Sequence, residues 1–261
     1  MCVDYLNKTM LISIITVTYN ADKTLAKLFA NAAKVLDVFA DVEHIIVDGA
    51  STDKTLEMLA AYSRLYANVK FISEPDTGIY NAMNKGVQLS TGQYVLHLNG
   101  DDWISDIAVF AELRSYLLEQ HPVVLSTPVE IYEGNRLYRT LPAKPINAFH
   151  ANFGFHFPHQ GTFFSRKLFL EVGAYNEHIG YVADKIFGFQ LLDVLPPSQL
   201  HATSRVAFAQ SAGGVSSRSS LTPLKTFLLT IQSAKRVQFK HPIARAVFNL
   251  VFKLLMLIGI K

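Results

Sequence analysis

The chain has 261 residues, half of them hydrophobic, which is enough to build the core of one large domain. Its single cysteine, Cys2, excludes an intrachain disulfide and fits a reducing compartment. The net charge of +3 is unevenly distributed, because residues 1–193 hold 15 basic and 21 acidic residues, whereas nine Lys and Arg and no acidic residue follow Asp193. We therefore expect a mildly acidic body and a basic tail whose partner is acidic, either a membrane or a nucleic acid.

Strands and helices are expected to alternate through the first 100 residues. Continuous apolar runs predict strands, and apolar residues at helical spacing predict helices. The strands are expected at 11–17, 44–48, 68–73 and 93–98, and the helices at 22–38, 52–66 and 79–89. This alternation predicts an α/β fold with a parallel sheet. Each strand ends in polar, mostly acidic residues, so the sequence predicts an acid-rich ligand site at the carboxyl edge of the sheet.

The pattern changes beyond residue 120 to a mixture of strands and helices attached to the same sheet. The sequence predicts a strand and then a hairpin that turns at 133–135, a strand at 161–166 and a final strand within 204–214. A helix is expected within 181–192, beginning near Asp184. No secretory signal is recognisable, because the apolar stretch at 10–17 has no cleavage site of small residues.

The basic tail, residues 216–261, has an amphipathic pattern near its end. Polar residues recur every four positions on an otherwise apolar segment: His241, Arg245, Asn249 and Lys253. This spacing predicts a helix that lies in a membrane interface with its basic residues toward the lipid headgroups. Packing of this helix on the domain and spanning of the bilayer are the alternatives, and the interrupting charges disfavour spanning. We expect a membrane surface, and no nucleic acid, as the partner of the tail.

Two adjacent carboxylates, Asp101 and Asp102, follow the fourth strand in LNGDDW (98–103). Clustered carboxylates resist simultaneous ionisation unless a cation neutralises them. With Asn99 beside them they form a set of oxygen ligands that suits Mg²⁺ or Mn²⁺ better than zinc. The structural alternative is that Asp102 caps the following helix and Asp101 is a turn residue.

The second strand ends at Asp48, in VDGASTDKT (47–55). Ser51 or Thr52 can cap the next helix, which leaves Asp48 to face the cleft and accept a hydrogen bond from a base or a ribose. Tyr19, at the end of the first strand, can supply an aromatic surface nearby. No glycine-rich phosphate loop follows the first strand, which argues against dinucleotide oxidoreductases and P-loop NTPases.

Four motifs together resemble the family 2 nucleotide-sugar glycosyltransferases, especially the bacterial O-antigen, capsule and exopolysaccharide enzymes. The motifs are SIITVTYN (13–20), VDGASTDKT (47–55), EPDTGIYNAMNKG (74–86) and LNGDDW (98–103). The resemblance covers about residues 10–215. It implies the GT-A fold, a mixed and mainly parallel sheet flanked by helices, in a domain of residues 1–215. Within it, about 10–103 form the nucleotide-binding half and about 104–215 the acceptor-binding half, and C-terminal amphipathic helices follow.

The resemblance implies an inverting transfer, in which an acceptor hydroxyl attacks the anomeric carbon of a UDP-, GDP- or dTDP-sugar while the nucleoside diphosphate leaves. It assigns Asp184 as the general base, for which helix capping is the alternative role. Further residues follow from the motifs: Asp101 and Asp102 for the metal and diphosphate; Val17, Tyr19, Asp48 and Asp76 for the nucleotide sugar; His159 and Gln160 for donor or acceptor; and AGGVSS (212–217) over the diphosphate.

The sequence departs from the family pattern at four positions. Thr16 stands where many relatives have Pro, Gly49 and Asn99 replace common aspartates, and Lys185 follows the expected base where an acidic residue is frequent. Because Trp103 is the only tryptophan, the QxxRW motif of processive synthases is absent, and we expect addition of a single sugar. The expected acceptor is a lipid-linked saccharide at the inner face of the plasma membrane, with the enzyme cytoplasmic and peripheral. A sugar nucleotidyltransferase and a non-catalytic membrane-associated scaffold are the alternatives.

Overall fold

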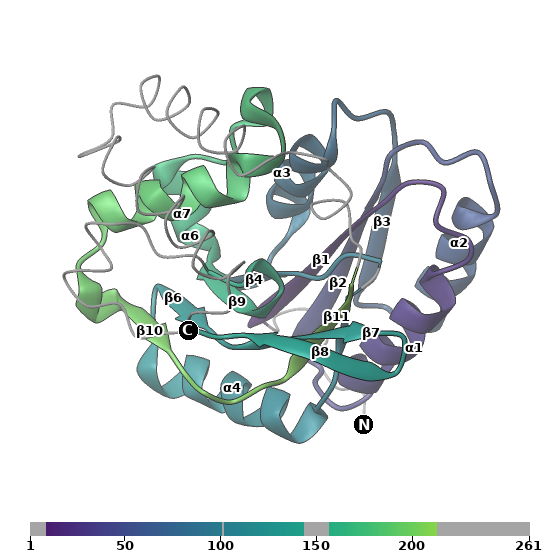
Figure 1. Ribbon diagram of the computed structural model, residues 1–261. Helices are drawn as coiled ribbons and strands as arrows, with labels where there is room; N and C mark the ends of the chain where they lie inside the picture. Colours follow the sequence, from purple (N-terminus) through teal and green to yellow (C-terminus); the bar gives the residue numbers. More distant parts are fainter. Residues whose placement is uncertain (1–8, 101, 144–156, 213–261) are drawn as a thin grey trace.

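The computed structural model describes residues 9–100, 102–143 and 157–212 (Figure 1). The first half of the chain alternates strands and helices as predicted. Its elements are β1 (Ile12–Thr18), α1 (Leu25–Leu36), β2 (Val42–Asp48), α2 (Thr55–Leu65), β3 (Val69–Ser73), α3 (Ile79–Leu89) and β4 (Tyr94–His97).

The second half mixes short strands with helices. Its strands are β5 (Asp102–Ile104), β6 (Val124–Ser126), β7 (Val129–Glu133), β8 (Arg136–Leu141), β9 (Thr162–Ser165), β10 (Leu200–Ala202) and β11 (Phe208–Ser211). Its α-helices are α4 (Ile107–Gln120), α6 (Arg166–Val172) and α7 (Ala183–Val194), and its short 3₁₀ segments are η2 (His159–Gly161), η3 (Glu177–Val182) and η4 (Pro197–Gln199). The predicted hairpin is β7–β8, which turns at Gly134 with a φ of 60°. The predicted helix near Asp184 is α7.

The main sheet has seven strands in the order β10-β6-β9-β4-β1-β2-β3. Its pairs are parallel except where β9 inserts antiparallel between β4 and β6. The predicted mixed, mainly parallel sheet is therefore confirmed. A second sheet, β5-β11-β7-β8, differs from the expectation that the whole second half joins one sheet. Three of the strands, β5, β6 and β10, have only three residues each, which is too short for a periodic pattern in the sequence.

Helices cover both faces of the main sheet (Figure 1). On one face, Ile15 of β1 belongs to a core that includes Met83 of α3 and Phe187 of α7. On the other face, Ile14 belongs to a core that includes Val35 of α1 and residues of α2 and α4. Alternate side chains of β1 thus enter opposite cores, which explains its continuous apolar run.

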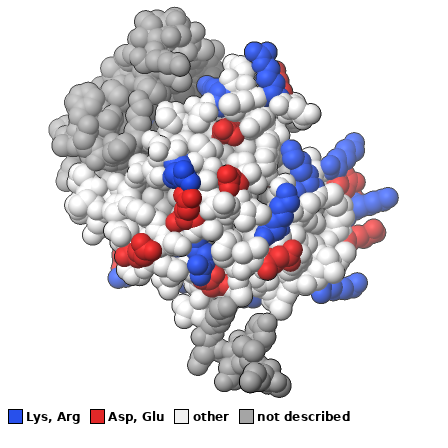
Figure 2. All heavy atoms as spheres, turned by 90° about the horizontal axis from the view of Figure 1, so that it is seen from below, with Lys and Arg blue, Asp and Glu red and all other residues white. Residues whose placement is uncertain are grey.

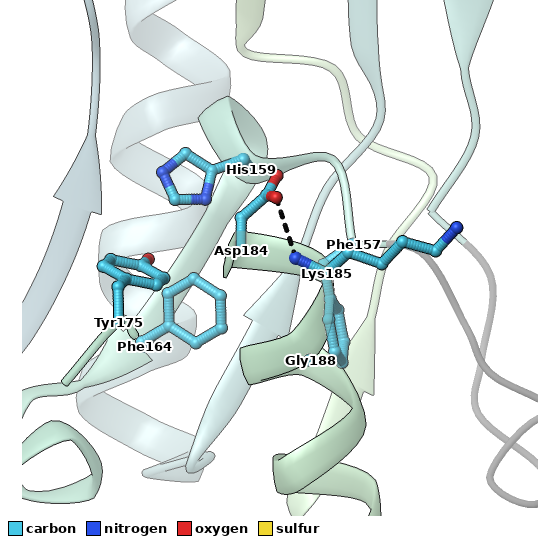
Figure 3. A pocket seen from close by; sticks show the side chains of 7 residues that line it. All are labelled: Phe157, His159, Phe164, Tyr175, Asp184, Lys185 and Gly188. Atoms are coloured by element: carbon cyan, nitrogen blue, oxygen red, sulfur yellow. Dashed lines mark hydrogen bonds between the residues drawn. The ribbon is translucent and has the colours of Figure 1, made fainter. Parts of the chain in front are cut away.

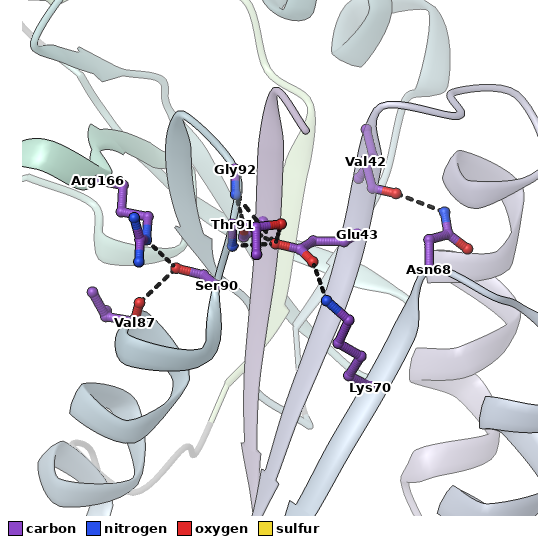
Figure 4. A network of polar contacts seen from close by, with 10 residues as sticks. Val42, Glu43, Asn68, Lys70, Val87, Ser90, Thr91, Gly92 and Arg166 are labelled. Atoms are coloured by element: carbon purple, nitrogen blue, oxygen red, sulfur yellow. Dashed lines mark hydrogen bonds and ion pairs between the residues drawn. The ribbon is translucent and has the colours of Figure 1, made fainter. Parts of the chain in front are cut away.

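A buried carboxylate joins three elements at the edge of the sheet where β2 begins (Figure 4). Glu43 Oε1 accepts hydrogen bonds from Ser13 Oγ at 2.6 Å and from Thr91 N and Oγ1 at 2.5 and 2.8 Å, and Lys70 Nζ lies 3.4 Å from Oε2. Burial alone would raise the pKa of Glu43, but the hydrogen bonds from Ser13 and Thr91 and the charge of Lys70 together hold it below its usual value. This edge lies opposite the strand ends that carry the candidate site, so Glu43 has a structural role.

A second polar contact lies inside the sheet, around Thr16 of β1. Thr16 Oγ1 donates to Leu98 O at 2.6 Å and lies 2.9 Å from His44 Nε2, while His44 Nδ1 lies 3.3 Å from the Tyr62 hydroxyl. Because the threonine hydroxyl donates to the carbonyl, it accepts from a protonated Nε2 of a neutral imidazole. Burial lowers the pKa of His44 to about 3.

The face seen from below carries acidic and basic side chains intermixed (Figure 2). Two residues of α4 form ion pairs, Arg114 with Asp41 at 2.5 Å and Glu112 with Arg205 at 2.6 Å. These pairs place opposite charges side by side on this face.

Within residues 9–100, 102–143 and 157–212, no helix is long and apolar enough to cross a membrane. The tail at 216–261 and most of AGGVSS (212–217) lie outside the described residues, so the amphipathic helix stays a prediction. The division of the domain near residue 103 also stays a prediction.

Candidate active site

The loops after β1 and β2 are joined by hydrogen bonds at the carboxyl edge of the main sheet. The Asn20 backbone N–H donates to Ser51 Oγ at 2.7 Å, and Asn20 Oδ1 accepts from Thr52 N at 2.8 Å. Asn20 and Ala50 both adopt left-handed backbone conformations, with φ of 48° and 61°. This conformation is unfavourable for alanine, and such strain is typical of loops whose shape is set by function.

Asp48, at the end of β2, is completely buried. Its Oδ1 accepts from Ser51 Oγ at 2.5 Å, and its Oδ2 accepts from Ser51 N at 2.9 Å and from Ser73 Oγ at 2.7 Å. The expectation that Asp48 is free to face the cleft is wrong, because these serines cover and satisfy its carboxylate. Ser51 does not cap α2 but turns back onto the aspartate, which fixes the loop after β2.

Tyr19, Gly49 and Asp76 lie together above Asp48. A Cβ placed on Gly49 would be 2.7 Å from Asp76 Oδ2 and 3.4 Å from Tyr19 Cδ2. The Tyr19 side chain is 64% exposed, and Val17 below it packs against the core. The missing side chain at position 49 thus leaves room for the Asp76 carboxylate.

The loop that carries Asp76 is held at both ends. Asp76 Oδ1 accepts from the Gly78 N–H at 2.9 Å at the start of α3. Lys85, one turn before the end of α3, donates to Pro75 O at 2.9 Å and pairs with Glu74 at 2.8 Å. The motif EPDTGIYNAMNKG therefore folds back on itself and presents the Asp76 carboxylate beside Tyr19.

The acidic motif after β4 is described except for Asp101, so the predictions for that residue remain untested. Asp102 is 3% exposed, and its Oδ2 accepts from the Asn99 N–H at 2.7 Å. The helix that follows is capped by Asp106, which accepts from Val109 N at 3.0 Å. The alternative that Asp102 caps this helix is therefore excluded.

The described residues hold no cluster of three His, Cys, Asp or Glu side chains that could bind a metal. One observation nevertheless fits an oxygen-bound cation near β5. Asn99 Oδ1 is buried and has no hydrogen-bond partner among the described residues, and it belongs to the same turn as the Asp102 carboxylate. A buried amide oxygen without a donor beside a carboxylate is the donor set that Mg²⁺ or Mn²⁺ prefers.

Asp184 lies in the first turn of α7, at a small pocket (Figure 3). Its Oδ1 accepts from the Tyr80 hydroxyl at 3.0 Å and from the Lys185 N–H at 2.8 Å. The Lys185 side chain points away from the carboxylate in Figure 3. The pocket is lined by Phe157, His159, Phe164, Tyr175, Asp184, Lys185 and Gly188. Asp184 is thus a half-buried carboxylate at the mouth of an aromatic pocket, and α3 holds it across the domain.

The polar face of α3 binds the segment that leads to Asp184. Asn84 donates to Tyr175 O and accepts from the Tyr175 N–H, each at 2.9 Å, and it also donates to Glu177 Oε1 at 2.8 Å. Asn81 donates to Glu177 Oε2 at 2.9 Å, and Tyr80 reaches Asp184. No role was predicted for these three α3 residues, although Tyr80, Asn81 and Asn84 lie at helical spacing, which was a signal for a polar contact on one face of the helix.

His159 is half-buried beside Asp184, and it stacks on His97 with ring centroids 4.8 Å apart. His97 Nδ1 and Nε2, His159 Nε2 and the Tyr175 hydroxyl have no hydrogen-bond partner among the described residues. Burial lowers the pKa of both histidines, most strongly for His97, while the charge of Asp184 acts in the opposite direction on His159. The structure thus brings His159 to Asp184, whereas Gln160 is half-buried and does not line the pocket.

Residues 13–173 match the model of a known family, glycosyl transferase family 2. The chain belongs to this family. It is therefore a glycosyltransferase, and the resemblance drawn from the four motifs is confirmed. A relative in Mycobacterium tuberculosis, a PGL/p-HBAD biosynthesis glycosyltransferase, is 29% identical over 182 residues, 68% of each chain. Chondroitin synthase of Escherichia coli is 34% identical over 104 residues, which are 40% of this chain and 15% of the synthase.

Two solved structures share the fold of this glycosyltransferase. Residues 1–349 of TarS from S. aureus, in complex with UDP-GlcNAc, superpose with a TM-score of 0.67 at 19% identity, over 87% of this chain and 66% of that one. The mannosyltransferase PcManGT from Pyrobaculum calidifontis, in complex with GDP-Man and Mn²⁺, gives a TM-score of 0.62 at 16% identity, over 92% and 69%. This chain thus spans slightly less than two thirds of the TarS structure.

Proposed function

We propose that the protein transfers one sugar, with inversion, from a nucleoside diphosphate sugar to a hydroxyl of a saccharide acceptor. The observation that carries this proposal is the link between two carboxylates through the start of α3. Asp76 Oδ1 accepts from the Gly78 N–H at 2.9 Å, and Tyr80, two residues on, donates to Asp184 at 3.0 Å. The start of α3 therefore holds both Asp76, the carboxylate proposed for the donor, and Asp184, the carboxylate proposed for the acceptor.

The nucleoside binds between Tyr19 and Asp76 in this proposal. The exposed Tyr19 ring offers a stacking surface, and Asp76 Oδ2 offers an acceptor for a base N–H or a ribose hydroxyl. Val17 and the buried Asp48 support this surface from below, since Asp48 fixes the loop after β2. A UDP-, GDP- or dTDP-sugar is the proposed donor, and the UDP-GlcNAc and GDP-Man in the two related structures support this class.

The diphosphate leaves beside the turn that begins at Asn99. A Mg²⁺ or Mn²⁺ ion held by Asp101, Asp102 and Asn99 would neutralise charge that develops on the departing diphosphate. The buried, unpartnered Asn99 Oδ1 supports this placement, as does the Mn²⁺ in the PcManGT structure. The chain itself contributes rigidity here, because the Asn99 N–H holds Asp102 Oδ2 at 2.7 Å.

Asp184 removes the proton from the acceptor hydroxyl as that oxygen attacks the anomeric carbon. Asp184 lies in the first turn of α7 at the pocket, and a positioned carboxylate is a suitable general base for a hydroxyl. His159, beside Asp184 in the pocket, bounds the space in which donor sugar and acceptor meet, and Gln160 is the next residue along η2. Attack on the face opposite the diphosphate inverts the anomeric configuration.

The proposed acceptor is a lipid-linked saccharide of surface-polysaccharide synthesis. The support is the sequence pattern of the tail, whose basic stripe suits a helix in the inner face of the plasma membrane, where the protein would be peripheral. We expect the purified protein to bind vesicles that contain anionic lipid. Deletion of 216–261 should abolish this binding. Equal binding of the truncated protein would contradict the membrane role of the tail.

The catalytic proposal is tested with variants of Asp184 and Asp102. Nucleotide sugars are first screened with Mn²⁺ for thermal stabilisation, and the donor that binds is used for transfer to saccharide acceptors. Asp184→Asn should lower kcat by about 10²–10⁴-fold while donor binding persists. Normal turnover of Asp184→Asn would refute the assigned base, and metal-independent activity that survives Asp102→Ala would refute the metal site.

A further inference from the structure

We propose that Tyr80 is a positioning residue for Asp184, and that it directs Oδ2 of this carboxylate, not Oδ1, to take the acceptor proton. The inference rests on the proposed role of Asp184 as the base. Tyr80 belongs to α3, within the predicted nucleotide-binding half of the chain.

The two oxygens of Asp184 have different surroundings. Oδ1 accepts both the Tyr80 hydroxyl at 3.0 Å and the Lys185 N–H at 2.8 Å. Oδ2 accepts no hydrogen bond from any residue that the structure describes. An oxygen that already accepts two hydrogen bonds is a poorer proton acceptor than one that accepts none. Oδ2 is therefore the free position for the proton of the acceptor hydroxyl.

The Tyr80 hydroxyl is held in place by its surroundings. Its side chain is 9% exposed, and its ring packs against Tyr175 with centroids 5.4 Å apart. Asn84, one turn further along α3, fixes the Tyr175 backbone by two hydrogen bonds. Burial raises the pKa of Tyr80, and the charge of Asp184 raises it further, so the hydroxyl stays a proton donor throughout the pH range of catalysis.

The other groups around Asp184 do not replace this contact. His159 lines the same pocket from η2, but its Nε2 has no hydrogen-bond partner among the described residues. The Tyr175 hydroxyl has no hydrogen-bond partner among the described residues, and the Lys185 side chain points away from the carboxylate in Figure 3. Of the side chains described around Asp184, Tyr80 is the one that donates a hydrogen bond to the carboxylate.

The test compares Tyr80→Phe with Tyr94→Phe, which removes a hydroxyl from another buried tyrosine at the amino end of β4. In Tyr80→Phe, kcat should fall about tenfold or more, because a hydrogen bond to a charged group is lost. KM for the donor should stay within about twofold, and the acidic limb of the kcat/KM profile should move to higher pH. Tyr94→Phe should leave kcat and the profile unchanged.

A second measurement needs no donor or acceptor. The melting temperatures of Tyr80→Phe, Asp184→Asn and the double variant form a double-mutant cycle, and the double variant should lose less than the sum of the two single losses. Additive losses would overturn the role of Tyr80. So would a wild-type kcat and pH profile in Tyr80→Phe while Asp184→Asn is inactive, and this outcome would leave Asp184 as the base. Full activity of Asp184→Asn would instead overturn the proposed base itself.

Discussion

Asn84 in α3 holds Tyr175 by both of its backbone groups, with Asn84 Nδ2 2.9 Å from Tyr175 O and Asn84 Oδ1 2.9 Å from Tyr175 N. The two residues are 91 positions apart in the chain, and Asn84 is buried. An amide side chain that pairs with a backbone N–H and C=O imitates a strand neighbour. This contact anchors the start of the segment that ends at Asp184.

We expect Asn84→Ala to lower the free energy of unfolding by about 3 kcal/mol, because it leaves the N–H and C=O of Tyr175 buried without partners. It should also lower kcat, because the segment that leads to Asp184 is then no longer anchored to α3. Urea unfolding and turnover measure the two effects. Asn31→Ala is the control, because the Asn31 amide donates only to Lys27 O on an exposed helix face, and it should change stability by less than about 0.5 kcal/mol. Equal effects of the two variants would contradict the anchoring role of Asn84.

The close approach of α3 to β1 depends on Gly86. A Cβ at this position would overlap Ile15 Cγ2. Gly86→Ala should therefore cost about 1–3 kcal/mol of stability, as overpacking of a core does. In an Ile15→Ala background, which removes the clashing atom, the same glycine substitution should cost little. A cost of the same size in both backgrounds would show that the loss has another origin.

The buried Glu43 should stabilise the fold in a pH-dependent way. Glu43→Gln removes the charge to which Ser13 and Thr91 donate, and we expect a loss of about 2 kcal/mol at pH 7. Because the pKa of Glu43 is lower in the fold than its usual value of 4.5, its contribution is complete above that pH and is lost as the pH falls. The variant should therefore lose less stability than the wild type on acidification. Glu171→Gln, at an exposed helix pair, is the control and should behave as the wild type does.

The buried His44 should make the protein sensitive to mild acid. Its pKa is about 3 in the fold against 6.5 for the free side chain, so between these values the unfolded chain binds more protons. Stability is complete above pH 6.5, and lowering the pH from 7.5 to 5 should remove about 2 kcal/mol. Urea unfolding at the two pH values measures this slope. His44→Gln should show a smaller slope, whereas His121→Gln, at the exposed end of α4, should keep the wild-type slope. An unchanged slope in His44→Gln would show that other groups cause the acid sensitivity.

The sequence predicted the elements of the first half well because each strand lies in an apolar run and each helix has apolar residues at helical spacing. It predicted the candidate residues at the strand ends from the same logic, since parallel strands bring their carboxyl ends together. It was wrong about the exposure of Asp48, because hydrogen bonding by Ser73 from the neighbouring strand cannot be read from the local pattern VDGASTDKT. It also missed the second sheet, whose strand β5 has three residues and pairs with β11, about 100 residues later.

The sequence by itself determined the α/β alternation, the acid-rich edge of the sheet and the family, because these follow from local periodicity and from motifs of contiguous residues. Only the tertiary structure decided which residues meet across the domain. Tyr80 and Asp184 are 104 positions apart, and nothing in the spacing of either motif pairs them. Their contact follows from the packing of α3 and α7 on the same face of the sheet, which depends on the shapes of many side chains in one core.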